Sequence, residues 1–381
     1  MTAMAIDPSA VDDEAVRRNR RTRLFAAMEA HDLDLLILGR PAEVAFATGA
    51  RQLWTAGSRP FGPACVAVRA TGHIHLLSVS DYDVPDEIGR DDLYGLWWNP
   101  ANLARALAEI PGLATARRVG TSSSSPGFDR LVAAIAPDAQ LVDGSRAVWE
   151  ARQPKSMAEV ERIVAAIAIA EAGLAAMEAA LHPGATEREL RAAHLTALAA
   201  AGAPTAPTEG VACATATTGP VTLRRIDVTT PIEAGQLVTL DPGAFHRGYE
   251  GGFARTRVAG AAPSTPQIDL AARSSVAIAA VIDACRPGAR GADLVAAWQR
   301  TGEPLAPVPL ATGVGLGTEP PIVDSTLGHD AVLAARTVLA ISSWVSKEGV
   351  GGVLLRDLVL VDDDGPHVLT ARHSHALERR G

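Results

Sequence analysis

Residues 235–260, with the sequence GQLVTLDPGAFHRGYEGGFARTRVAG, decide the fold of this 381-residue chain. The apolar run 237–240 predicts a buried strand, and Asp241 follows it directly, where a Pro-Gly pair turns the backbone. A second strand is predicted over about residues 249–259. A carboxylate at the end of a buried strand is costly unless it has a partner. Asp241 is therefore a candidate site residue because of its surroundings alone.

The composition excludes several kinds of partner. The formal net charge of −8 argues against nucleic acid or an anionic membrane surface as the main partner. The three cysteines, Cys65, Cys213 and Cys285, form no disulfide or metal-binding pattern, which fits a reducing cytosol. The N-terminal region carries Asp12, Asp13, Glu14 and a basic run at 17–23 before any apolar stretch, so we expect no signal peptide. The apolar stretch 164–177 contains a glutamate and is too short to span a bilayer. We therefore expect a cytoplasmic protein without a membrane partner.

The chain length and pattern predict two α/β domains, residues 1–153 and 154–381. In the first domain, helices alternate with strands, and a hairpin surrounds a Thr-Gly turn. The expected helices are 13–31, 101–109 and 128–135. The expected strands are 33–38, 65–68, 73–79 and 118–120.

The second domain is predicted to contain two similar halves. Ser156 with Glu159, and Thr186 with Glu189, form two capping boxes that start consecutive helices. Strands at 209–214, 237–240 and 251–259 follow. A second pair of helices, 265–285 and 291–301, precedes strands at 313–316, 338–341 and 351–361. Two halves of helix, helix and antiparallel strands indicate internal pseudo-symmetry, and such a unit can bury a cleft between its halves.

The stretch 235–260 resembles the first metal-binding hairpin of the creatinase/Xaa-Pro aminopeptidase family. The family pattern of L-I-D-A-G, G-Y and G-D-x-T-R-T aligns with the sequences at 240–243, 248–249 and 255–256, but Gly252 occupies the position of the second carboxylate. The resemblance covers most of the chain. It implies a creatinase-like N-terminal domain followed by a pita-bread C-terminal domain, with the active site in the cleft of the latter.

The metal enzymes of that family use two Asp, one His and two Glu as ligands. By resemblance these five positions are Asp241, Gly252, Thr312, Ser342 and Arg356, so that one ligand of the five is left. Two bridged divalent cations need several anionic ligands. Arg356 also brings a fixed positive charge to a cation's place. We therefore expect no metal and no other cofactor.

Two catalytic histidines of the family are also replaced. One falls on Arg224, or on the adjacent Arg225, and the other on Glu319. His246 and Glu250 lie on the turn or strand between the two parts of the hairpin. Either side chain is able to face the cleft, although a solvated position is the more common case.

We expect Asp241 and Glu319 to handle protons, and Arg356 and Arg224 to bind an anionic small molecule, with Thr312 and Ser342 adding hydroxyl groups. The structural alternatives are equally concrete. Asp241 and Arg356 form a buried ion pair that replaces the metals as a structural link. In the same view, Glu319 is a rim carboxylate and the two hydroxyl residues only fill space.

A segment of the N-terminal domain resembles a part of the family that reaches the partner's cleft in creatinase-like dimers. Residues 46–49 (FATG) carry this resemblance, and Arg51, Gln52, Trp54 and Arg59 follow. Arg51 and Trp54 are therefore candidate substrate-binding residues across a homodimer interface. Arginine and aromatic side chains are equally typical of an ordinary interface.

The function expected from these residues is that of a metal-independent enzyme for a small, carboxylate-bearing molecule, with creatinase-like hydrolysis of a C–N bond as the nearest example. An elimination, cyclisation or isomerisation in small-molecule metabolism is the alternative, because no metal-activated water supports hydrolysis. A homologue that binds without turnover is a further alternative, and a metallopeptidase is the least favoured.

Overall fold

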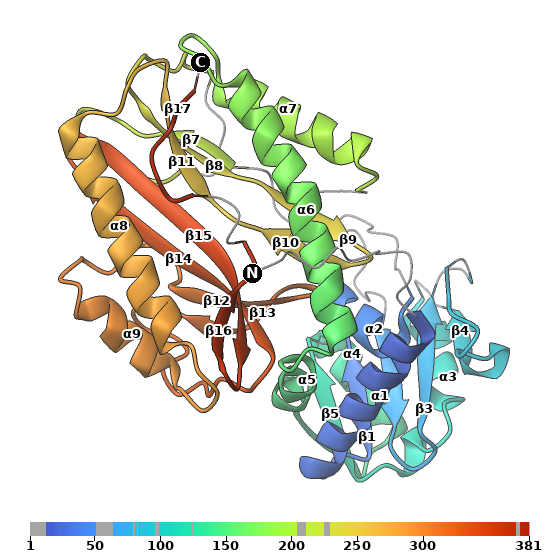
Figure 1. Ribbon diagram of the computed structural model, residues 1–381. Coiled ribbons are helices and arrows are strands. Elements are labelled where there is room, and N and C mark those ends of the chain that lie inside the picture. Colours follow the sequence, from blue (N-terminus) through green and yellow to red (C-terminus); the bar gives the residue numbers. More distant parts are fainter. Residues whose placement is uncertain are drawn as a thin grey trace. The chain divides into compact units, whose positions relative to one another are not determined.

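The computed structural model describes residues 13–50, 64–78, 81, 83–95, 99–123, 125–203, 211–224, 229–370 and 374–380. The chain divides into two compact units, with the division between Arg152 and Gln153 (Figure 1). This is one residue before the boundary expected from the linker composition.

The N-terminal unit is a mixed sheet with helices packed on it. The sheet has the order β4-β3-β2-β1-β5-β6; β1 is antiparallel to β2 and parallel to β5. The elements are α1 (Asp13–Ala30), β1 (Leu35–Leu38), α2 (Pro41–Thr48), β2 (Ala64–Val68), β3 (His73–Ser78), η1 (Arg90–Asp92), β4 (Leu93–Gly95), α3 (Pro100–Ala108), η2 (Leu113–Thr115), β5 (Arg118–Ser122), α4 (Pro126–Ile135), β6 (Gln140–Asp143) and α5 (Ser145–Arg152).

The central strand β1 has the sequence LLIL and is buried along its whole length. A strand buried on both faces has a continuous apolar sequence rather than an alternating one. On one face, Leu35 and Ile37 pack with Leu103 and Leu107 of α3 and with Phe128 of α4. The expected hairpin around Thr71-Gly72 forms as β2 and β3.

The C-terminal unit contains two helix pairs and the strands between them. Its elements are α6 (Met157–Ala180), α7 (Glu187–Ala200), β7 (Val211–Ala214), β8 (Leu237–Asp241), β9 (Gly243–His246), β10 (Tyr249–Gly252), β11 (Arg255–Ala259), α8 (Thr265–Ala284), α9 (Gly291–Gln299), β12 (Ala311–Gly315), β13 (Gly317–Val323), β14 (Thr337–Lys347), β15 (Gly351–Asp362), β16 (Gly365–Val368) and β17 (Arg379–Arg380).

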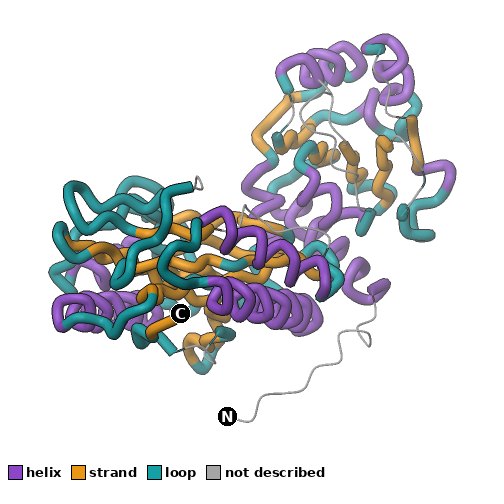
Figure 2. Tube along the Cα trace, turned by 90° about the horizontal axis from the view of Figure 1, so that it is seen from above, coloured by secondary structure: helices purple, strands orange, loops and turns teal. Residues whose placement is uncertain are grey.

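The strands of this unit form sheets of order β17-β11-β8-β7 and β13-β12-β14-β15-β16, and the pair β10-β9. Figure 2 shows the helices along one side of these strands. The two predicted capping boxes form at Ser156 and Thr186. In each, the hydroxyl accepts a hydrogen bond from the backbone N–H of the Glu three residues later, and the carboxylate of that Glu accepts one from the backbone N–H of the capping residue. The main core lies between α8, α9 and the strands β12, β14 and β15.

The single strand expected over 249–259 is wrong, because it is broken into β10 and β11, which belong to different sheets. A tight turn with positive φ at Arg247 (49°) and Gly248 (83°) joins β9 to β10. Two such residues form a type I′ hairpin, for which Asn-Gly is the usual sequence, so Arg-Gly gave no clear signal. Gly251 then approaches α6 so closely that a Cβ there would lie 2.4 Å from the backbone N of Ile167.

The helix α6 is longer than the apolar stretch recognised in the sequence. It has 24 residues and contains an 18-residue window with a mean hydropathy of 1.8, enough by length and composition alone to cross a membrane. In the structure this helix packs on α7 and on the hairpin β9–β10. A core helix covered on two sides has the same apolar composition as a membrane span.

Candidate active site

Asp241, at the end of β8, is bound by Arg356 of β15. Nη1 of Arg356 donates to both carboxylate oxygens of Asp241, at 2.6 Å each. The Asp241 side chain is 8% exposed and that of Arg356 is 18% exposed. Hydrogen bonds between ionised groups are stronger than neutral ones. The carboxylate at the end of the buried strand therefore has the partner that its position requires.

Ser342 holds the other edge of the same guanidinium. Nε of Arg356 donates to Oγ of Ser342 at 3.0 Å. Ser342 and Arg356 lie opposite each other in the antiparallel pair β14–β15, so their side chains share one face of the sheet. On the other face, Ile341 and Leu355 belong to the core under α8. Strand register thus brings three of the predicted residues, Asp241, Ser342 and Arg356, together.

Glu319 of β13 forms a second buried ion pair, with Lys155. Lys155 Nζ lies 2.5 Å from Glu319 Oε1 and 3.0 Å from the carbonyl oxygen of Gln153. The side chains are 2% and 3% exposed, so Glu319 is a buried ion-pair residue rather than a rim carboxylate. A Cβ at position 315 would lie 2.8 Å from Glu319 Oε2. Gly315 thus leaves the space that the Glu319 carboxylate occupies.

Glu250 of β10 lies among these charges, although the sequence favoured a solvated position for it. Its side chain is half-buried, and Thr318 Oγ1 donates to Glu250 Oε2 at 3.5 Å. Burial raises the pKa of Glu250 to about 7; the carboxylates of Asp241 and Glu319 add to this, and the charge of Arg356 opposes it. We call Asp241, Glu250, Glu319 and Arg356 the charged cluster.

Sequence reasoning missed Lys155 and underrated Glu250. Lys155 stands in a linker directly before a capping serine, where a lysine is normally solvated, and no pattern marks it as buried. Glu250 did carry a signal: it follows the buried Tyr249 by one residue on a short strand, so it faces the opposite side from a core residue.

Two other predicted residues take different positions. Thr312 of β12 pairs with Ala340, two residues before Ser342 on β14, and so faces the same side as Ser342; no hydrogen bond joins it to the cluster within the described residues. Arg224 Nη2 donates to Glu187 Oε1 at 2.5 Å and to the carbonyl of Ala214 at 3.1 Å. Arg224 thereby ties its loop to α7.

Three candidates lie outside the described residues: Arg51 and Trp54, expected at a substrate pocket, and Arg225, the alternative to Arg224. The homodimer expected from the same segment stays a prediction.

One buried histidine lies behind the charged cluster. His194 of α7 is fully buried and packs on Gly173 of α6, where a Cβ would lie 2.5 Å from His194 Cδ2. Burial lowers the pKa of His194, while the carbonyl of Gly243 and the charge of Asp241 act in the opposite direction. The ring thus lies close to the turn that follows Asp241.

Comparison with known proteins identifies the class to which this fold and site belong. Residues 161–363 match metallopeptidase family M24, and residues 20–153 match the creatinase/prolidase N-terminal domain. The chain belongs to metallopeptidase family M24, a hydrolase family that includes prolidases and Xaa-Pro peptidases, and has its creatinase-like N-terminal and pita-bread C-terminal domains. The resemblance recognised in the hairpin is therefore confirmed.

Solved structures show the same fold at low sequence identity. Dipeptidase PepE from Mycobacterium ulcerans has a TM-score of 0.78 at 21% identity, with 97% of this chain and 99% of that chain covered. The Xaa-Pro dipeptidase from Bacillus anthracis gives 0.78 at 18% identity, covering 95% and 99%. The prolidase from Pyrococcus horikoshii OT3 gives 0.76 at 21%, covering 92% and 97%. No curated protein sequence matches the chain.

The residues at the expected metal positions do not fit a pair of divalent cations. Arg356 donates to both oxygens of Asp241, which are the atoms that would bind the metal. Ser342 and Thr312 offer neutral hydroxyls, and Gly252 offers no side chain. Hard divalent cations in protein sites require several carboxylate ligands. A guanidinium in the centre of the set adds repulsion.

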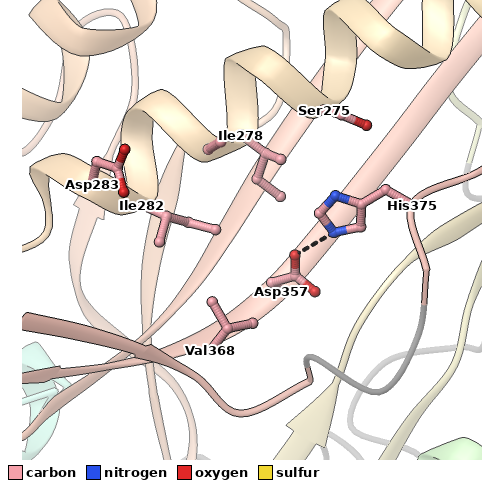
Figure 3. Close-up of a pocket in the computed structure, with 8 residues that line it drawn as sticks. Ser275, Ile278, Ile282, Asp283, Asp357, Val368 and His375 are labelled. Carbon is pink, nitrogen blue, oxygen red and sulfur yellow. Dashed lines mark hydrogen bonds and ion pairs between the residues drawn. The ribbon is translucent and has the colours of Figure 1, made fainter.

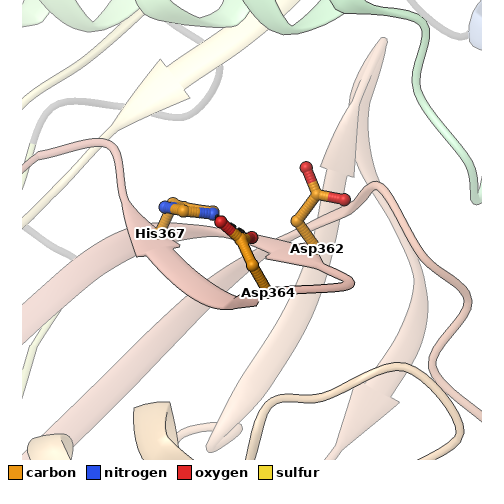
Figure 4. A group of neighbouring side chains, drawn as sticks. All are labelled: Asp362, Asp364 and His367. Carbon is orange, nitrogen blue, oxygen red and sulfur yellow. Dashed lines mark hydrogen bonds and ion pairs between the residues drawn. The ribbon is translucent and has the colours of Figure 1, made fainter.

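A different cluster of possible ligands lies on the turn between β15 and β16 (Figure 4). Within the described residues, the ligand atoms of Asp362, Asp364 and His367 come within 4.8 Å of one another. His367 Nε2 lies 2.7 Å from Asp364 Oδ1, and this contact lowers the pKa of Asp364. Asp364 and His367 thus pair with each other on this turn, as acidic turn residues commonly pair with a neighbour.

Proposed function

We propose that this chain is a metal-independent member of its hydrolase family that acts on a small, carboxylate-bearing molecule. The observation that carries the proposal is the bond between Arg356 and Asp241. By the family resemblance, a side chain with a permanent charge stands where the family has a metal-binding carboxylate, and it pairs with the one acidic ligand that is left.

Arg356 is the anchor that we propose for the substrate carboxylate. Within the described part of the chain, Arg356 makes its hydrogen bonds through Nη1 and Nε. The two N–H groups of Nη2 are therefore available to a ligand. The guanidinium is also partly exposed. Asp241 and Ser342 fix its plane, and a fixed guanidinium loses less entropy when it binds a carboxylate.

Glu250 is the group that we propose for proton transfer. The sequence suggested Asp241 and Glu319, but the carboxylate of each is engaged in an ion pair, with Arg356 and with Lys155 respectively. A general acid or base works best when its pKa is near the working pH, and the pKa of Glu250 is raised to about 7. Ionised Glu250 takes a proton from the attacking water, and protonated Glu250 gives it to the leaving nitrogen.

The surroundings of Arg356 suit a small substrate with an apolar part. Trp344 and Leu354 lie two residues from Ser342 and Arg356 on the same face of β14 and β15, and pack with Ala254. Val221 and Leu223 cover them in part. Because the fold neighbours are named as prolidases and Xaa-Pro dipeptidases, a C–N bond near a carboxylate is the nearest model for the bond cleaved.

A non-hydrolytic step on the same residues is the second candidate. It is favoured by the poor ligand set at Asp241, because hydrolysis then lacks the metal-activated water that the fold otherwise provides. Glu250 would move a proton within the substrate instead of taking it from water.

The experiment begins with purified full-length protein incubated with chelator. A library of small carboxylic acids with amide, amidine or guanidine groups is screened by thermal shift, and hits are tested for conversion in water labelled with oxygen-18. We expect conversion that is unaffected by chelator, about 100-fold slower in Glu250→Gln. Oxygen-18 in the product indicates hydrolysis, and its absence from a converted product indicates the second candidate.

A restored ligand set provides the matched control for metal independence. The variant with Gly252→Asp, Thr312→His, Ser342→Glu and Arg356→Glu is expected to bind Mn²⁺ in calorimetry, whereas the unchanged protein is expected to bind none at this site. A Cβ at position 252 would lie 3.2 Å from the carbonyl oxygen of Pro242, so the aspartate fits after a small shift. Loss of all activity in chelator, restored by Mn²⁺, would contradict the proposal.

A further inference from the structure

A pocket lies on the other face of β15, against α8, and the buried carboxylate that lines it already has its partners (Figure 3). Arg255 Nη2 and Thr370 Oγ1 both donate to Oδ1 of Asp357 at 2.7 Å. The other oxygen of Asp357, Oδ2, lies 2.7 Å from Nε2 of His375. Because both oxygens are bound within the protein, this buried group requires no ligand.

A histidine cluster on the N-terminal sheet differs in this respect. His73 and His75 stand two residues apart on β3, so their side chains share one face of the sheet. Asp92 ends η1 and directly precedes β4, which runs parallel to β3 with Leu93 opposite Leu76. This register places Asp92 beside His75. We call His73, His75 and Asp92 the histidine cluster.

Both imidazole rings place Nδ1 close to the same carboxylate. Nδ1 of His75 lies 3.1 Å from Oδ1 of Asp92. Nδ1 of His73 lies 3.3 Å from the same oxygen and 3.1 Å from Oδ2. Two ligands of one tetrahedral zinc ion stand about 3.4 Å apart, since their bonds are about 2.0–2.2 Å long. The nitrogen–oxygen distances of the cluster are therefore near those of atoms that share an ion.

The two rings themselves are farther apart, with 6.2 Å between their centroids. One of them must turn for both nitrogens to bind the same ion. The side chain of His73 is 59% exposed, so this ring has the freedom to turn inward, whereas that of His75 is held in the interior.

His75 is the buried member of the cluster, and its ring nitrogens lack hydrogen bonds. Its side chain is 2% exposed, and neither nitrogen is hydrogen-bonded to any described residue. Although Oδ1 of Asp92 is close to Nδ1, it lies off the direction in which an N–H there would point. Two atoms that bind one ion have this relation, because the ion and not the neighbouring ligand lies on the nitrogen's axis. A buried polar group without a partner is costly, and a bound ion removes that cost.

The charges around the cluster suit a cation. Burial lowers the pKa of His75; Asp92 opposes this effect and His73 adds to it. A neutral ring is the form that binds a metal. The ring of Tyr94 lies 5.7 Å from that of His75. Burial raises the pKa of Tyr94, and the carboxylates of Asp92 and Glu109 add to this, so the local field is negative.

We propose that the histidine cluster binds one divalent transition metal ion, with zinc as the reference ion, through Nδ1 of His73, Nδ1 of His75 and a carboxylate oxygen of Asp92. Imidazole nitrogen suits zinc, nickel and copper, whereas magnesium and calcium prefer oxygen ligands. Three protein ligands leave the fourth tetrahedral position to water. The ion would join η1 and the short edge strand β4 to β3. This site does not depend on the function proposed for the charged cluster, with which it shares no residue.

The test is calorimetric titration of zinc into full-length, tag-free protein that has been stripped of metal with chelator and desalted, at pH 7.5. We expect the unchanged protein to bind zinc, and His73→Ala to weaken this binding about tenfold or more. His73 is largely exposed, so the variant should fold like the unchanged protein. Cobalt in place of zinc reports the geometry, because a tetrahedral site absorbs visible light more strongly than an octahedral one.

The exposed turn between β15 and β16 supplies the matched control. His367→Ala removes the histidine of the other group of possible ligands, Asp362, Asp364 and His367, and should leave the zinc affinity of the histidine cluster unchanged. Absence of zinc binding to the unchanged protein would overturn the inference. So would zinc binding that survives His73→Ala, or that is lost equally in both variants.

Discussion

The strand β15 offers two ion pairs at adjacent positions, and they differ in exposure and in completeness. The pair of Arg255 and Asp357 has side chains 0% and 1% exposed. Thr370 and His375 complete the hydrogen bonding of this carboxylate. The pair of Arg356 and Asp241 has side chains 18% and 8% exposed, and an edge of its guanidinium is available to a ligand.

The two pairs show how one kind of contact serves two purposes. A buried, saturated pair contributes mainly by avoiding the cost of an unpaired charge, so losing one partner is severe. Burial also lowers the pKa of Arg255 against the opposing charge of Asp357, which shows how far this pair is removed from water. A partly exposed pair is less costly to lose, and its charge remains available for binding.

The largest effect is expected when the saturated pair is broken. Arg255→Leu leaves Asp357 buried without its guanidinium, and should lower the free energy of unfolding by about 3–5 kcal/mol. Urea denaturation monitored by circular dichroism measures this. The double variant Arg255→Leu/Asp357→Asn should recover part of the loss, because no buried charge is left unpaired. A loss below about 1 kcal/mol in Arg255→Leu would mean that the buried pair contributes no more to stability than an exposed ion pair does.

An intermediate effect is expected at Glu250, next to the open pair. The folded-state pKa is raised to about 7 from 4.5, so between these pH values the folded protein binds a proton that the unfolded chain has released. The contribution of Glu250 to stability is therefore lost as pH rises from 4.5 to 7. Glu250→Gln removes this loss and should be more stable than the unchanged protein at pH 8 by about 1–3 kcal/mol.

Urea titrations of both proteins at several pH values check the sign. The difference in stability should vanish well below pH 4.5, where the carboxyl group is protonated in both states. A difference that is constant with pH would show that the folded protein does not raise the pKa of Glu250.

The smallest effect is expected at the edge of the open pair. Ser342→Ala removes the acceptor of Arg356 Nε, a single hydrogen bond to a partly exposed group, and should cost about 0.5–1.5 kcal/mol. Substrate affinity should fall more than stability, because the guanidinium loses one of the two contacts that fix its plane. Calorimetric binding of a hit from the carboxylic acid screen measures this second quantity, and unchanged affinity would remove Ser342 from the anchor.

The sequence was sufficient for the fold wherever local chemistry was strong. Capping boxes at Ser156 and Thr186 set the helix starts, and the apolar run before Asp241 set β8. The meeting of Asp241 with Arg356 and Ser342 was also foreseeable, but through family resemblance rather than through spacing, because more than 100 residues separate the two ionic partners.

The rest depends on contacts that no local pattern encodes. Lys155 reaches Glu319 across 164 residues of sequence from a linker that is normally solvated. Glu250 acquires its surroundings because the Arg-Gly turn folds β10 back on β9. The pocket at α8 requires His375, near the end of the chain, to meet β15, and nothing in the sequence around His375 predicts that contact.

The register of β14 and β15 makes the length of β15 more restrictive than its composition. Ser342 faces Arg356, and Ile341 faces Asp357. One residue inserted or deleted between Gly351 and Leu355 would shift every later side chain to the opposite face. A deletion would place Asp357 beside Ser342, an insertion would place Leu355 there, and either change would move the guanidinium of Arg356 among the apolar side chains below α8. A substitution in this strand therefore changes one side chain in one compartment, whereas a change in its residue count inverts both compartments at once.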